Sequence, residues 1–113
     1  MNPVIKQKWL EALRSDEFDQ GTGMLKSYDG KYCCLGVLCE LFRRQHSVQK
    51  NIDWHGGLFL QRVAVLPTEV IKWAGLEHNN YNPRVGEEQK TLSDYNDTGY
   101  SFEQIANLIE ENL

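Results

Sequence analysis

One ten-residue stretch decides the fold of this chain: Tyr32-Cys33-Cys34-Leu35-Gly36-Val37-Leu38-Cys39-Glu40-Leu41. It follows Asp29-Gly30, a dipeptide typical of the two-residue turn between antiparallel strands. Within the stretch, the spacing of apolar residues changes from the two-residue period of a strand to the period of a helix. We therefore predict a β-hairpin, with strands at 24–28 and 31–34, that leads into a second helix at 35–44.

The same stretch holds all three cysteines of the chain, and three interpretations of them stay open. A zinc site needs four ligands, commonly in closely spaced cysteine pairs, and this spacing does not provide them. A catalytic thiolate needs a lowered pKa, which Cys34 would obtain at the start of a helix. Free cysteine otherwise behaves as a small buried hydrophobe, the interpretation we favour. We accordingly predict no catalytic residue, no metal site and no cofactor.

The segment before the hairpin is predicted to be a helix followed by a loop. Asn2 is a good N-cap, Pro3 suits the first helical position, and apolar residues recur at helical spacing up to about Arg14. Two glycines in the polar stretch 16–23 indicate a loop. The chain should thus begin with an N-terminal helix that a loop joins to the hairpin.

The part of the chain after the second helix carries signals for short elements only. Residues 45–57 are expected to form a loop, 58–66 a strand or an extended buried segment, and Arg84-Val85 a short strand. Ser101 with Gln104 forms a capping box ahead of an apolar face. Together these elements predict an α+β fold in one compact domain over 1–113. Short C-terminal helices are expected at 67–74, 92–99 and 101–113.

Charge and hydropathy limit the classes of function. The net charge of −4 argues against nucleic acid as a partner, because phosphate contacts need a basic face. Residues 1–50 hold eight Lys and Arg against six Asp and Glu, whereas residues 51–113 hold four against ten. This asymmetry permits a pocket for an anionic ligand, or head-to-tail contacts between subunits.

Location is indicated by three absences in the sequence. No apolar run reaches the ~20 residues that span a bilayer. The N-terminus lacks the layout of a signal peptide, and the odd, unspaced cysteines suit a reducing compartment. We expect a cytoplasmic protein with no membrane partner.

Nine residues are candidates for binding a nucleotide-sized anionic ligand. Loop glycines offer backbone N–H groups to a phosphate, aromatic residues can stack on a base, and arginines, Arg44 and Arg62 included, can bind phosphate. Each feature also has an ordinary explanation. The glycines can serve a turn, and the aromatic residues can lie at the edge of the core. The arginines can serve solubility, and the asparagine can cap a helix locally. The candidates are Gln20, Gly21, Gly23, Arg43, Trp54, Tyr81, Arg84, Tyr95 and Asn96.

The chain resembles a family of small proteins encoded by bacteriophages and prophages. The segment 32–41 is the most distinctive part of the resemblance, which spans nearly the whole chain. It implies a phage setting and therefore the cytoplasm of a bacterial host. The other matching segments are 9–15, 20–23, 66–67, 73–76, 92–99, 101–102, 105–106 and 108–111.

Small phage proteins of this size and build include counter-defence "sponges", which bind nucleotide-derived immune signals and withhold them from host effectors. By analogy, we expect a non-enzymatic protein that sequesters a cyclic ADP-ribose isomer, another ADP-ribose derivative or a cyclic dinucleotide. Since sponges generally place their pockets between subunits, a homo-oligomer is expected. The alternatives are a protein–protein inhibitor of a host enzyme and, with less support, a nucleotide-cleaving enzyme that uses Cys34 or a histidine.

Overall fold

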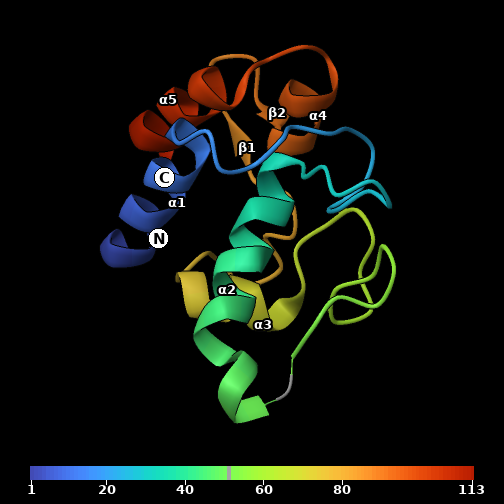
Figure 1. The fold of residues 1–113 in the computed structure, drawn as a ribbon. Helices are drawn as coiled ribbons and strands as arrows, with labels where there is room; N and C mark the ends of the chain where they lie inside the picture. The colour runs from blue at the N-terminus through green and yellow to red at the C-terminus, as the bar shows by residue number, and fades with distance from the viewer. Residues whose placement is uncertain (51) are drawn as a thin grey trace.

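Five α-helices and one two-stranded antiparallel hairpin make up the described part of the chain (Figure 1). The computed structural model describes residues 1–50 and 52–113, and it describes the side chains of all of these except 47–50. The α+β fold in one compact domain is confirmed, with a radius of gyration of 12.8 Å. No helix among these residues has both the length and the apolar character to cross a membrane. The elements are α1 (Pro3–Arg14), α2 (Cys34–Lys50), α3 (Thr68–Ala74), β1 (Arg84–Val85), β2 (Lys90–Thr91), α4 (Leu92–Asp97) and α5 (Phe102–Asn112).

Helix α1 is the predicted N-terminal helix and has the predicted bounds. The Asn2 side chain accepts hydrogen bonds from two backbone N–H groups of the first turn, at 2.9 and 3.1 Å. Trp9 is fully buried and donates its indole N–H to the Cys34 carbonyl at 3.0 Å, which ties α1 to the start of α2. Helix α1 also lies beside α5, so the two ends of the described chain meet (Figure 1).

Helix α2 is the central element, and α1, α3 and α4 pack against it. Every residue from Cys33 to Glu40 is buried, so the first turns of the helix are covered on all sides. Gly36 allows the closest approach, since a Cβ at this position would lie 1.8 Å from the carbonyl oxygen of Leu25. The small residues of this stretch therefore let the preceding loop pack directly on the helix.

Both ends of α2 differ from the prediction. The helix begins at Cys34, one residue early, and continues to Lys50 instead of ending at Arg43-Arg44. The two arginines bind Glu40 one turn back along the helix, so this basic pair serves an ion-pair network and does not mark a helix terminus. The predicted loop at 45–57 is consequently helical up to Lys50, and residue 51 lies outside the described residues.

The hairpin predicted at 24–34 is present only as a chain reversal. The Ser27 N–H donates to the Lys31 carbonyl at 2.8 Å, and one residue pair, Lys26 with Tyr32, forms an antiparallel bridge. The Ser27 hydroxyl accepts from the Lys31 N–H at 3.0 Å and also binds the Asp29 carboxylate. These side-chain bonds support a wider turn than the two-residue type, and α2 begins before a second strand pair can form.

The paired strands lie later in the chain. Arg84 is opposite Thr91 and Val85 is opposite Lys90, which confirms the predicted short strand at 84–85. The two-stranded hairpin therefore leads into α4 and not into α2. Its place beside α4 and α5 is seen at the top of Figure 1.

Residues 58–66 form neither a strand nor an extended buried segment, so both predicted alternatives are wrong. His55 and Leu58 exchange two backbone hydrogen bonds, and so do Phe59 and Arg62, which gives two successive two-residue reversals. The Phe59 side chain is fully buried between them. The segment is thus a compact folded loop with one aromatic anchor in the core.

The three short helices of the second half are confirmed, and their caps explain where they stop and start. Gly75 ends α3 in the left-handed region, at φ 69°, and the following Leu76 N–H donates to the Ile71 carbonyl. Ser101 and Gln104 form the predicted capping box at the start of α5. Such caps are encoded within four residues, which is why the sequence reveals them.

Candidate functional site

Two polar side chains are buried in the described part of the chain, and each is the centre of a network. Glu40 is 4% exposed and Asn96 is 2% exposed. A buried polar group is tolerated only when its hydrogen-bonding capacity is filled, so both positions merit close description. Every other candidate is judged by whether its polar atoms remain free for a ligand.

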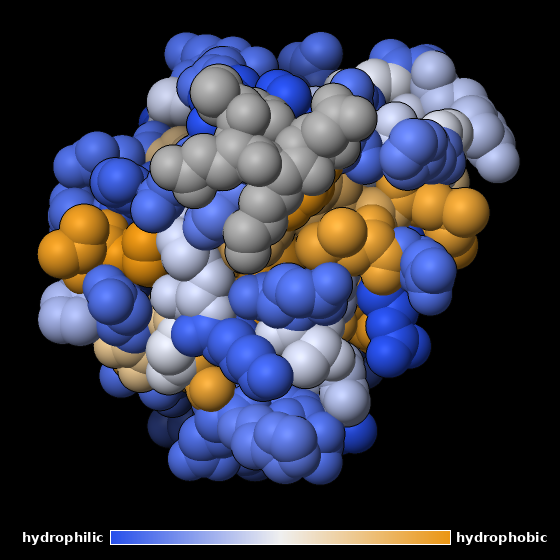
Figure 2. Space-filling model, turned by 90° about the horizontal axis from the view of Figure 1, so that it is seen from below, coloured by the Kyte–Doolittle hydropathy of each residue, from blue (hydrophilic) through white to orange (hydrophobic). Residues whose placement is uncertain are grey.

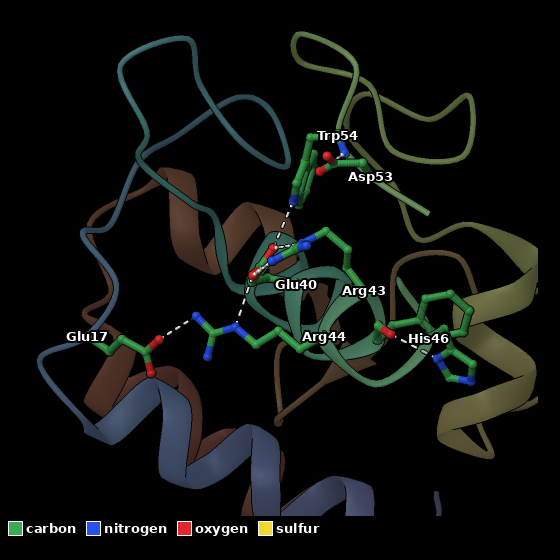
Figure 3. A network of polar contacts seen from close by, with 8 residues as sticks. Glu17, Glu40, Arg43, Arg44, His46, Asp53 and Trp54 are labelled. Carbon is green, nitrogen blue, oxygen red and sulfur yellow. Dashed lines mark hydrogen bonds and ion pairs between the residues drawn. The ribbon is translucent and has the colours of Figure 1, made fainter. Parts of the chain in front are cut away.

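The Glu40 carboxylate lies between two arginines and a tryptophan (Figure 3). Oε1 accepts from Arg43 Nε at 2.8 Å and from Trp54 Nε1 at 2.9 Å. Oε2 accepts from a terminal nitrogen of Arg43 at 2.8 Å and from Arg44 Nε at 2.9 Å. Arg44 reaches on to Glu17 in the loop after α1. The network joins α2 to the segments on either side of it.

Electrostatics make this network a permanent ion cluster. Burial alone would raise the pKa of Glu40, but hydrogen bonds from the two guanidinium groups and the indole outweigh burial and lower the pKa to about 2. The carboxylate therefore stays ionised at neutral pH and is a poor proton donor or acceptor. Arg43 has committed both prongs of its guanidinium to this carboxylate, so it is not free to bind a phosphate.

Trp54 is held in the same network by packing as well as by its indole bond. Its ring is 5.9 Å from that of Tyr32 and 4.7 Å from that of Phe59, and Lys26 Nζ lies 5.4 Å from its centroid. The candidates Arg43 and Trp54 are thus neighbours, as a ligand site would require. Their binding groups are, however, turned towards the protein.

Asn96 in α4 gathers four of the nine predicted residues. Its Oδ1 accepts from the Cys34 N–H at 3.2 Å and from Gln20 Nε2 at 3.0 Å, and its Nδ2 donates to the Gly21 carbonyl at 2.8 Å. The Gly23 N–H, meanwhile, donates to the carboxylate of the neighbouring Asp97 at 3.2 Å. The glycine-containing loop at 20–23, the cysteine-rich stretch at 32–41 and α4 therefore meet at Asn96 and its neighbour Asp97.

The groups in this Asn96 junction bind one another. A cavity of about 120 Å³ adjoins it, and a nucleotide-sized ligand needs ~300 Å³ or more. Gln20, Gly21 and Asn96 thus serve to close the fold, and the space beside them is small. The cavity is lined by Gly23, Met24, Cys33, Ala64, Val65, Asn82, Ser93 and Asp97.

The cysteines belong to the core and not to a reactive site. Burial raises the pKa of Cys33 to about 11 and raises the pKa values of Cys34 and Cys39 well above the ordinary value. Cys34 does lie at a helix start, but its thiol is enclosed and faces the Leu92 carbonyl at 3.6 Å. A thiolate at neutral pH is therefore disfavoured. No cluster of three metal-ligating side chains occurs among the described residues.

The remaining candidates divide between core and surface. Tyr95 is buried in α4, its ring lies against that of Tyr100, and its hydroxyl donates to the Val85 carbonyl at 2.9 Å, so no face is open for stacking. The half-buried Tyr81 and the exposed Arg84 line one cavity of about 490 Å³. That cavity also contains Glu77, His78, Asn79, Asn80 and Asn82.

Arg62 extends this surface site towards a second cavity. Its guanidinium lies 5.3 Å from the centroid of the Tyr81 ring, and it lines a cavity of about 590 Å³ together with Leu60, Gln61, Thr68 and Glu69. The Leu66 N–H donates to the Tyr81 carbonyl at 2.9 Å and fixes the two loops side by side. The set Arg62, Tyr81 and Arg84 is called the arginine–tyrosine site below.

In the part of the chain that the structure describes, Arg62 and Arg84 differ from the other arginines in having no ion pair, although Arg84 donates to the Gln89 carbonyl at 3.0 Å. Among the described residues, Arg62 and Arg84 have no carboxylate oxygen within 4.0 Å. The other three arginines of the chain, Arg14, Arg43 and Arg44, are all in ion pairs. The sequence indicated Arg62, Tyr81 and Arg84 but not Gln61, which the reversal at 59–62 places on the same cavity as Arg62.

The comparisons with known proteins identify a family and add no activity. A family model described as "Domain of unknown function (DUF8296)" matches residues 1–113. Neither the curated proteins nor the solved structures contain a match to the chain. The geometry of the sites described above is therefore the basis for a proposed function.

Proposed function

The chain belongs to the DUF8296 family, and from the geometry of its surface we propose that it binds and sequesters a nucleotide-derived signal without catalysis. The observation that carries this proposal is the arginine–tyrosine site. Two arginines, without carboxylate partners among the described residues, and a half-buried tyrosine line two cavities of nucleotide size, and one of the arginines lies over the tyrosine ring. The ligand classes are a cyclic ADP-ribose isomer, another ADP-ribose derivative or a cyclic dinucleotide, and the setting is phage counter-defence in the host cytoplasm.

The chemistry of such ligands matches the groups at the site. Guanidinium groups bind phosphate oxygens in a two-pronged geometry, and a tyrosine ring stacks on a base. Glu69 and Glu77 line the two cavities and can accept hydrogen bonds from ribose hydroxyls. A ligand with base, ribose and phosphate would use all three kinds of group, whereas inorganic phosphate would use only the arginines.

The protonation states of the buried titratable groups support binding of the ligand without catalytic turnover. The one buried carboxylate described is held ionised, and the thiols are held neutral. His78 lines the 490 Å³ cavity and is the residue through which the alternative of a nucleotide-cleaving enzyme would act. Recovery of the ligand intact after incubation, read by mass spectrometry, decides between the two.

A second surface supports the proposal of self-association. Tyr28 is 88% exposed, Leu58 41% and Val63 44%, and they lie on neighbouring reversals, since the Leu25 N–H donates to the Val63 carbonyl and Gly56 lies beside the Tyr28 ring. Exposed apolar side chains that gather in this way mark interaction surfaces. Figure 2 shows orange areas separated by blue residues on the face seen from below.

Two partners fit this apolar surface, namely a second copy of the chain or a host enzyme that the protein inhibits. Light scattering of the purified protein measures the first directly. A homo-oligomer that Tyr28→Ser reduces to a monomer supports self-association. A monomer that captures one stoichiometric host enzyme from lysate, and loses it on Tyr28→Ser, supports the inhibitor instead.

Ligand binding is tested by thermal shift and calorimetry against ADP-ribose, cyclic ADP-ribose isomers and cyclic dinucleotides. A ligand at 100 times its Kd stabilises the fold by about 2.7 kcal/mol, which is ~11 °C for a domain of this size. Arg62→Gln and Arg84→Gln should each weaken binding, while Lys8→Gln, an exposed cation on α1, should not. Absence of any shift across the panel, at millimolar ligand, would contradict the proposal.

A further inference from the structure

The turn at the rim of the 590 Å³ cavity is strained. Leu60 and Gln61 have φ angles of 47° and 71°, and the flanking Phe59 and Arg62 exchange two backbone hydrogen bonds of 2.9 Å. This is the two-residue reversal with positive φ at both central positions, for which asparagine and glycine are the favoured residues. Leucine and glutamine adopt this conformation at a cost that glycine avoids.

A second two-residue reversal in the same loop can be compared with the strained turn. The preceding reversal, between His55 and Leu58, has the same loop length and uses Gly56-Gly57, where Gly56 has a positive φ of 64° and Gly57 does not. Two adjacent reversals of one loop thus differ in that one has glycines and the other has side chains. A side chain kept in a strained turn indicates a role for that side chain, and such strain collects at functional sites.

The two side chains of the strained turn have different surroundings. Leu60 is partly buried and packs against the core, which accounts for its retention. Gln61 is exposed, lines the cavity, and its carboxamide has no hydrogen-bond partner in the part of the chain that the structure describes. Packing does not account for Gln61. Gln61 lines the same 590 Å³ cavity as Arg62, whose guanidinium lies 5.3 Å from the centroid of the Tyr81 ring.

We propose that Gln61 reads the base of the bound ligand and that this base is adenine. The inference rests on the proposed function. A carboxamide presents one donor and one acceptor side by side, the pattern that pairs with the exocyclic amine and N7 of adenine. Guanine presents two acceptors on the same edge and is matched by arginine or lysine instead. The arginines then bind the phosphates, and Gln61 selects among ligands that share them.

The test compares adenine and guanine forms of one ligand: ADP-ribose against GDP-ribose, and cyclic di-AMP against cyclic di-GMP, by calorimetry. Wild type should prefer the adenine form about tenfold or more. Gln61→Gly should remove that preference and, by relieving the turn, raise the melting temperature by about 4 °C. Gln61→Glu keeps size and strain, loses the donor, and should weaken adenine binding without the gain in stability.

Each outcome decides a distinct claim. If wild type binds both forms equally, or if Gln61→Gly keeps the preference, the adenine reading is overturned while the proposed function stands. If wild type binds neither pair nor any other nucleotide, the proposed function fails and the reading of the base fails with it. If the Gln61→Gly protein has a higher melting temperature and no preference for adenine, the inference is supported. Replacement of a purely structural residue would not raise the stability and abolish the base preference together.

Discussion

Replacement of Glu40 by glutamine perturbs a buried carboxylate that accepts four hydrogen bonds. The substitution keeps the shape and removes the charge, so the half-buried Arg43 loses its ion pair, and Arg44 loses one of its two carboxylate partners and keeps Glu17. Loss of one partner from a buried ion pair costs ~3–5 kcal/mol. We expect Glu40→Gln to unfold more readily than wild type at neutral pH.

The pKa provides an independent magnitude. A fall from the ordinary value of 4.5 to about 2 corresponds to about 3 kcal/mol of native-state stabilisation of the ionised form. Because the folded-state pKa is the lower one, this stability is present above about pH 4.5 and is lost as the pH falls towards 2. Near pH 7 the melting temperature should fall by ~12 °C. At pH 2 the variant and wild type should converge.

Urea denaturation followed by circular dichroism at several pH values measures this difference. Subtraction of the variant from wild type cancels the titration of the other carboxylates. Glu111→Gln is the matched control, because this exposed carboxylate has no ion pair among the described residues and should change stability by less than ~0.5 kcal/mol. A Glu40→Gln protein as stable as wild type at pH 7, or a difference that persists unchanged at pH 2, would refute the reasoning.

Three further predictions concern the core. Asn96→Ala should lower the free energy of unfolding by about 2–4 kcal/mol in urea, because it strands several buried partners, and a loss below ~0.5 kcal/mol would contradict the junction. Gly36→Ala should lower it by about 3 kcal/mol or more, since the added Cβ meets the Leu25 carbonyl, and a folded variant with unchanged stability would contradict that packing. Thiol titration with a disulfide reagent at pH 8 should be silent in the native state and give three equivalents in denaturant, whereas fast native labelling would show an accessible thiolate. The thiols are Cys33, Cys34 and Cys39.

Signals encoded in a few neighbouring residues were sufficient to predict most helix boundaries. The caps at Asn2, Gly75 and Ser101 each depend on atoms within four residues, and α1, α3 and α5 begin or end where these caps lie. The hairpin prediction failed because the Ser27 side chain competes for the turn, and that competition is not visible in the Asp29-Gly30 dipeptide. A local sequence pattern therefore predicts the structure of a segment when a single local interaction determines it.

Contacts between distant residues were beyond reach of the sequence alone. Cys34 and Asn96 are 62 positions apart, and nothing in either segment states that one caps the other. The end of α2 was misplaced for a similar reason, because Arg43 and Arg44 resemble a helix terminus until Glu40 and Trp54 are seen to engage them. Hydrogen-bond partners that are distant in sequence determine whether a polar side chain remains available to a ligand. They therefore determine which residues can form a binding site.

The central claim is that the arginine–tyrosine site holds a nucleotide-type ligand. The most direct measurement is mass spectrometry of the small molecules released on denaturation from protein purified out of phage-infected, defence-active cells. Wild-type protein should release a nucleotide-type compound in near-stoichiometric amount, and Arg62→Gln protein should release far less. Equal release from both proteins, or no nucleotide from either, would contradict the claim.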